Sequence, residues 1–174
     1  MIPGARVLIL LAAAALAACS PTLDWREFVP EGSEINVTFP CRVDRHARSV
    51  VMADASVRME MLVCNAGDTT YAVSFFDVAD PARVSATLAE WRATAVRNVQ
   101  GAAPQQQPVQ IKGMTPNDEA VRLSVTGRLP DGAAVREHAV FFAHGLRVYS
   151  ATVLGANPPQ QAVDIFFSGL KFPS

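Results

Sequence analysis

Long apolar runs are absent from this sequence of 174 residues. The N-terminal run from Val7 to Ala18 has twelve residues, whereas a helix that crosses a bilayer needs about 20. Twelve is typical of the core of a secretory signal, which has about 7–15 residues, follows a positive charge and ends in small residues. Arg6 supplies that charge. We therefore predict that residues 1–18 are a signal peptide that is cut away.

Familiar catalytic motifs are missing as well. The chain has no GxSxG, HExxH or phosphate-loop motif, and it has three histidines. His138 and His144 are six residues apart on a predicted strand, a separation of about 20 Å that is too long for one metal ion. We expect each histidine to be a solvated or hydrogen-bonded surface residue. We therefore predict that the chain is not an enzyme and that it holds no metal or cofactor. Two alternatives remain, a carrier of an apolar ligand and an enzyme with an unrecognised site.

The chain also lacks a strong net charge. Its formal charge is −1, and loss of the signal leaves −2, so nothing indicates nucleic-acid binding. The local exception is a basic cluster on the first predicted hairpin, formed by Arg42, Arg45, His46 and Arg48. It is either an anion site, for example for lipid phosphate, or a solvated turn that Asp44 partly neutralises. We favour the solvated turn.

Cysteine is scarce, and the first of the three cysteines ends the apolar run. The stretch Leu16-Ala17-Ala18-Cys19 resembles the bacterial lipobox, in which the signal is cut just before a cysteine. The resemblance implies that the Cys19 sulfur receives a diacylglycerol and that its new amino group receives an acyl chain such as palmitate. Two or three acyl chains anchor a protein stably, whereas one holds it only marginally. The alternative is an ordinary signal that is cut near a cysteine.

The predicted localisation follows from this lipid. Ser20 stands where an Asp would indicate retention in the inner membrane, so we expect the outer membrane, at its periplasmic face. The membrane is then one partner, through Cys19. A second expected partner is an envelope protein, whose identity the sequence does not give.

The other two cysteines, Cys41 and Cys64, form an even pair suited to an oxidising compartment. A disulfide is the leading prediction, and it would close a loop of 24 residues. Zinc and redox sites use closely spaced cysteine pairs, whereas these two lie 23 positions apart with no CxxC. Two buried free thiols remain the alternative.

The sequence after the signal predicts a tether at residues 19–33 and a single α+β domain at residues 34–174. Alternating apolar and polar residues predict strands both before and after a helical segment. Segregated hairpins favour an antiparallel sheet sandwiched by helices over a doubly wound sheet.

Two helices are expected in this domain. The first, at residues 82–98, follows Asp80-Pro81, a good cap followed by a proline suited to the first helical position. The second, at residues 158–168, has one apolar face. We expect three aromatic side chains on these helices to be buried: Trp91, Phe166 and Phe167.

The same pattern resembles the PsbP-like fold. The segments that carry the resemblance are residues 35–40, Asp80-Pro81, residues 147–149 and residues 166–172. Members of this fold include an extrinsic photosystem II subunit, a yeast nuclear-import factor that binds Ran, and bacterial envelope lipoproteins. The resemblance implies a binding or scaffold protein and supplies no catalytic residues.

A second resemblance is to uncharacterised proteobacterial lipoproteins. It rests on Trp25-Arg26-Glu27, Phe39-Pro40-Cys41 and Cys64. It implies a non-catalytic envelope role. Besides the arginines of the basic cluster, Arg147 and Tyr149 are the candidate binding residues, because anchors of this kind are typical of interfaces.

Overall fold

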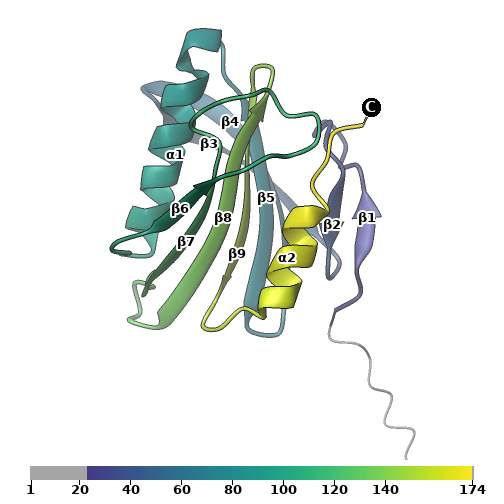
Figure 1. Cartoon of the computed structure of the whole chain (residues 1–174), viewed down its shortest axis with the longest axis vertical. Helices are drawn as coiled ribbons and strands as arrows, with labels where there is room; N and C mark the ends of the chain where they lie inside the picture. The colour runs from purple at the N-terminus through teal and green to yellow at the C-terminus, as the bar shows by residue number, and fades with distance from the viewer. Residues whose placement is uncertain (1–22, 174) are drawn as a thin grey trace, which may run out of the picture.

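The computed structural model describes residues 23–173, so the predicted signal peptide and Cys19 lie outside the described residues. Its centre is a seven-stranded sheet in which all neighbouring strands are antiparallel (Figure 1). In sheet order the strands are β3 (Asp44–Met52), β4 (Ala55–Ala66), β5 (Thr69–Asp77), β9 (Arg147–Gly155), β8 (Ala134–His144), β7 (Val121–Arg128) and β6 (Gln105–Pro108). The predicted α+β class with an antiparallel sheet is confirmed.

Elements cover both faces of this sheet (Figure 1). Helix α1 (Val84–Asn98) lies on one face. Helix α2 (Gln160–Ser168) lies on the other face, together with a small second sheet of β1 (Arg26–Phe28) and β2 (Val37–Phe39). The sandwich of helices around a sheet is therefore present.

Two separate hydrophobic cores result, because successive side chains of a strand point to opposite faces. On β5, Phe75 belongs to the core under α2, and Phe76 belongs to the core under α1. On β9, Tyr149 and Val148 divide in the same way. The central strands are buried on both faces, and this double coverage fixes their register.

The start of α1 follows the predicted capping chemistry. The Asp80 carboxylate accepts a hydrogen bond from the Ala82 amide, and Pro81 begins a 3-10 turn that leads into the helix. Trp91 is buried between Phe76 and Phe141. The helix and its buried aromatic residue are as predicted, apart from the short turn at its start.

Helix α2 has the predicted burial but a different N-terminus. Phe166 and Phe167 are buried. The helix begins at Gln160 after Pro159, which makes no side-chain cap. The Gln160 amide bonds to the Asp164 carboxylate one turn later, so it stabilises the helix surface and leaves the N-terminus uncapped.

The first hairpin is longer than the sequence pattern indicates. The sequence pattern predicts a hairpin whose strands are residues 49–53 and 56–65, with alternating apolar and polar residues in the second. In the structure β3 already begins at Asp44. The early part of β3 is polar and exposed because it lies on an edge strand, so it lacks the alternation that would predict it. Ala53 and Asp54 both have positive φ, the conformation of a tight two-residue hairpin turn.

The folded domain also begins before residue 34. Strand β1 lies inside the segment expected as a tether, and it pairs with β2. Leu23, Trp25 and Phe28 pack on the core under α2. The domain therefore includes residues from Leu23 onward, although the sequence predicts a tether as far as residue 33.

Candidate functional site

The basic cluster does not form one site. Arg45 and Arg48 lie on β3 opposite Leu62 and Met59, which belong to different cores, so these two arginines point to opposite faces of the sheet. Arg45 contacts Glu60 and the Glu31 carbonyl oxygen. Arg42, Arg45 and Arg48 are all exposed. This exposure agrees with the expected solvation. The expected turn is absent, because Arg45, His46 and Arg48 lie on the extended edge strand β3 and Arg42 comes just before it.

Arg147 forms a structural contact in place of the predicted binding contact. Its guanidinium donates two hydrogen bonds to the Asp77 carboxylate, at 2.6 and 2.8 Å, and a third to the Gly32 carbonyl oxygen. Hydrogen bonding by this guanidinium lowers the pKa of Asp77. Arg147 therefore ties the segment before β2 to the sheet.

Tyr149 is not available to a partner. Its side chain is 0% exposed, and its hydroxyl donates to the Ser33 carbonyl oxygen at 2.8 Å. Burial raises its pKa above the ordinary range. The prediction of a surface anchor here is wrong, because the same strand face that carries Arg147 at its end carries Tyr149 into the core.

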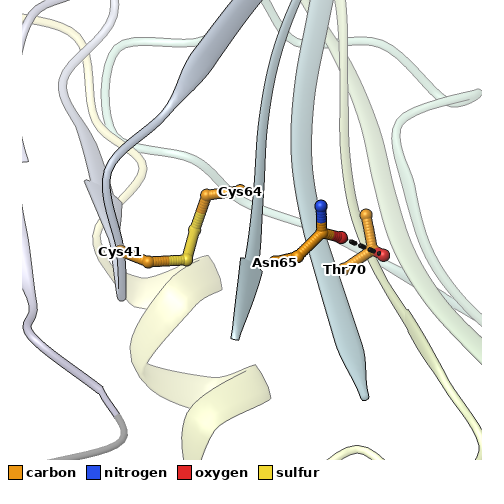
Figure 2. The surroundings of a disulfide bond; sticks show 4 residues. All are labelled: Cys41, Cys64, Asn65 and Thr70. Atoms are coloured by element: carbon orange, nitrogen blue, oxygen red, sulfur yellow. Dashed lines mark hydrogen bonds between the residues drawn. A yellow bond between two sulfur atoms is a disulfide. The ribbon is translucent and has the colours of Figure 1, made fainter. Parts of the chain in front are cut away.

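The predicted disulfide joins Cys41 to Cys64, with their Cα atoms 5.8 Å apart (Figure 2). It links the segment that follows β2 to strand β4, next to the edge of the sheet. Beyond it, the Thr70 hydroxyl donates to Asn65 at 2.7 Å across the β4–β5 hairpin. The bond is a structural staple, and its sulfurs are not free for chemistry.

A groove with a volume of about 390 Å³ runs along α1. Its floor consists of small side chains on β5 and β9. Because these side chains are small, they leave open space between the sheet and α1. Its walls include large apolar side chains from β4, α1 and β9. The floor residues are Ala72, Ser74, Ser150 and Thr152, and the wall residues include Met59, Met61, Trp91 and Leu154.

Glu137 lines the same groove from β8. Its side chain is 6% exposed, and it makes no hydrogen bond or ion pair with the residues that the structure describes. Burial raises the pKa of this carboxyl to about 7. No fully enclosed side-chain nitrogen or oxygen among residues 23–173 lacks a hydrogen-bond partner. The unpaired carboxyl oxygens of Glu137 are therefore not fully enclosed, and they reach the groove. A buried, unpaired carboxyl in a cleft is a feature of functional sites.

Sequence reasoning missed Glu137, although a signal for it exists. On β8 it shares strand parity with Val135, Ala139 and Phe141, all of which are buried. A carboxylate at an apolar position of a strand is expensive to bury. The neighbouring His138 has the opposite strand parity and points to the other face of the sheet.

A second pocket, of about 380 Å³, lies on the α2 side of the sheet and contains His138 and Ser124. These residues are directly opposite each other on β8 and β7, but no hydrogen bond between them is present. His138 is 7% exposed, so the expectation of a surface histidine is wrong here. Burial, followed by the charges of Arg122 and Arg136, lowers its pKa.

His144 agrees with the expectation of a surface histidine that is hydrogen-bonded. It is exposed, its Nδ1 lies 2.8 Å from the Gly113 carbonyl oxygen, and its ring stacks on Phe172. This position is structural, because the contacts connect the loop before β7 to the C-terminal segment.

Ser168 and Lys171 have the serine–lysine spacing of some acyl-transfer enzymes, a match that sequence reasoning also missed. The Ser168 hydroxyl donates to the Ile165 carbonyl oxygen, and Lys171 pairs with Glu27 at 2.8 Å. The two side chains are therefore directed to other partners and make no nucleophile–base pair.

Within residues 23–173, no group of three or more His, Cys, Asp or Glu side chains is close enough to hold a metal ion. No helix in that part of the chain has the length and apolarity of a membrane span.

No protein-family model matches the chain, and no curated protein matches it in sequence.

Proposed function

We propose that this chain is a bacterial lipoprotein, anchored through Cys19 at the periplasmic face of the outer membrane, that binds a partner or ligand without catalysis. The groove along α1 is the observation that carries the binding role. Its volume of about 390 Å³ lies in the range of small-molecule sites, about 300–1,000 Å³. Its lining contains an unpaired carboxyl and no Cys, His, Lys or Tyr.

The short distance along the chain between Cys19 and the domain supports a role next to the membrane. Leu23 already packs on the core, and four residues, 19–22, span at most about 14 Å. A lipidated Cys19 would hold the domain against the headgroups, so its ligand or partner would come from the membrane or from its immediate surface.

We further propose that the domain is PsbP-like. The support is the order of elements, with hairpins before and after α1 and α2 at the end of the chain, together with the short segments that resemble that fold. The fold alone does not define a function, so the proposed role rests on the groove and the lipobox.

The anchor is tested by a Cys19→Ala variant. Loss of the thiol removes the only atom that can carry the thioether lipid, so we expect an unprocessed or soluble form and no incorporation of labelled palmitate. Ser20→Ala is the matched control, and it should remain processed and membrane-bound. A Cys19→Ala protein that still fractionates with membranes after removal of its signal would contradict the lipid anchor.

The second candidate is an enzyme that uses the pocket containing His138 and Ser124. The observation in its favour is a buried histidine of lowered pKa opposite a serine. We expect a screen of the purified protein against ester, amide and phosphate substrates to find no turnover. An activity that His138→Ala abolishes, and that His46→Ala leaves intact, would replace the binding role with catalysis.

Partner proteins are tested by crosslinking the lipidated protein in intact envelopes and purifying it. A partner captured by the wild type, and lost when groove residues are replaced, would assign the groove to a protein. Loss after changes on the opposite face would assign binding to the surface of α2.

A further inference from the structure

Glu137 is buried in a way that does not favour folding. Burying a carboxylate without a partner is unfavourable by several kcal/mol when it is ionised. Some buried polar groups have a partner, as the Tyr149 hydroxyl does in the Ser33 carbonyl oxygen. The buried Tyr71 hydroxyl has none among the described residues, but it is neutral, whereas Glu137 carries a charge when it is ionised. Glu137 has none among the described residues, although its oxygens open into the groove. The missing partner is therefore expected to come from a molecule in the groove.

Only one other ionisable side chain lines the groove, Arg48. Arg48 lies on the edge strand β3, and β4, β5 and β9 separate it from Glu137 on β8. Four strand-to-strand steps correspond to about 19 Å, so Arg48 cannot neutralise this carboxyl directly. The end of the groove at Glu137 therefore has a single, uncompensated negative group when the carboxyl is ionised.

The surroundings of Glu137 are suited to an apolar body. Leu154 lies directly opposite Glu137 on β9, and Val99 and Leu129 also line this end. Further along the groove, Met61 and Trp91 continue the apolar wall. Polar contacts near the same end are limited to short hydroxyls and amides, which include Thr70, Thr152 and Asn98.

We propose that the groove binds a small amphiphilic amine, whose apolar body lies along Leu154, Met61 and Trp91 and whose ammonium group pairs with the Glu137 carboxylate. This inference rests on the proposed binding function and names the ligand class of that same groove.

Charge and size favour this class over the alternatives. An ammonium group supplies the positive charge that Glu137 lacks, and the hydroxyl oxygen of Thr152, on the neighbouring strand β9, can accept one of its remaining N–H bonds. A carboxylate or phosphate ligand would be repelled at this end. A whole helix of a protein partner is too large for about 390 Å³, a volume that suits a drug-sized molecule.

The test compares two probes of one shape, 4-phenylbutylamine and 4-phenylbutan-1-ol. The lipidated full chain is held in phosphatidylcholine nanodiscs, binding is titrated by ligand-observed NMR, and empty nanodiscs give the background. We expect the wild type to bind the amine roughly 10- to 100-fold more tightly than the alcohol, because a hydrogen bond to a charged group is that much stronger. Glu137→Gln should remove this preference and leave the affinity for the alcohol unchanged.

Two further variants complete the test. Glu31→Gln removes a carboxylate whose side chain is 95% exposed, and it should bind both probes as the wild type does. Ala72→Leu fills the groove floor, and it should weaken both probes together. Equal affinity of the wild type for amine and alcohol, or no saturable binding of either, would overturn the amine assignment. Neither result would affect the proposed lipid anchor, which is tested separately by fractionation of the Cys19→Ala variant.

Discussion

Glu137 combines a site for a ligand with a penalty for folding. Its pKa of about 7 lies well above the ordinary value of about 4.3 for a free glutamate. Between these two values the unfolded chain loses a proton that the folded chain keeps, so stability falls as the pH rises through this window. Below pH 4 both states are protonated, and above pH 8 the loss is complete.

Glu137→Gln is therefore expected to stabilise the protein in alkaline solution. At pH 8 the free energy of unfolding should rise by up to about 4 kcal/mol, since one pKa unit corresponds to about 1.4 kcal/mol. At pH 4 the change should be close to zero. Urea unfolding at the two pH values measures the difference, with Glu31→Gln as the control. An equal effect at both pH values would mean that the carboxyl is not perturbed by burial.

Tyr149 gives a second prediction at the scale of one residue. Tyr149→Phe leaves the buried Ser33 carbonyl oxygen without its donor, so we expect a loss of about 1–3 kcal/mol. Tyr71→Phe is a matched control, because Tyr71 is also buried but its hydroxyl bonds to no described residue. Chemical denaturation of both variants makes the comparison. Equal losses would contradict a stabilising contribution of the hydrogen bond between Tyr149 and Ser33.

At the scale of elements, the C-terminal end of α1 is fixed against β7 by a close backbone approach. The Val99 carbonyl oxygen accepts a hydrogen bond from the Arg128 amide at 2.6 Å. A Cβ atom on Gly127 would lie 1.9 Å from that oxygen, which the backbone could relieve only by moving. The glycine is therefore required by packing between a helix end and a strand.

Gly127→Ala should accordingly separate α1 from β7 or prevent folding. We expect a loss of about 3 kcal/mol or more, the upper part of the range for overpacking, read as a lower thermal midpoint and reduced yield. Thr126→Ala, at an exposed position of the same strand, should change stability by much less. A Gly127→Ala protein as stable as the Thr126→Ala protein would contradict the close approach.

The disulfide also acts between elements, because it connects the segment after β2 to β4. Replacing both Cys41 and Cys64 by Ser should lower the free energy of unfolding by about 3.4 kcal/mol, from the entropy of closing a 24-residue loop. Reduction of the wild type by dithiothreitol should produce the same change. Two thiols that react with an alkylating agent in the native, oxidised protein would contradict the bond.

For the whole molecule, the elements that sequence patterns predicted well are those with one clear apolar face. Helix α1 has this property, and its cap at Asp80 is a local interaction. The beginning of β3 was missed because an exposed edge strand needs no apolar alternation. β1 was assigned to a tether because a three-residue strand is stabilised by its partner β2 and leaves no periodic pattern of its own.

The candidate site was harder to predict than the fold. Arg147 and Tyr149 are residue types common at interfaces, but their contacts with Gly32 and Ser33 depend on segments more than 110 residues away in the chain. The groove exists because small residues of β5 and β9 become neighbours in the sheet. No local sequence pattern indicates that β5 and β9 are paired. The hollow beneath α1 can therefore be predicted only after this strand pairing is known.

The link between Cys41 and Cys64 also determines an order of events, if the chain is exported as proposed. Reducing conditions in the cytoplasm keep such thiols apart, and oxidation becomes favourable only after translocation. The newly made chain therefore lacks part of its final stability while it must still pass, unfolded, through the secretion channel. Formation of the disulfide after translocation makes folding effectively irreversible. The bond that holds β4 in place therefore also distinguishes the unfolded, reduced chain in transit from the folded, oxidised protein.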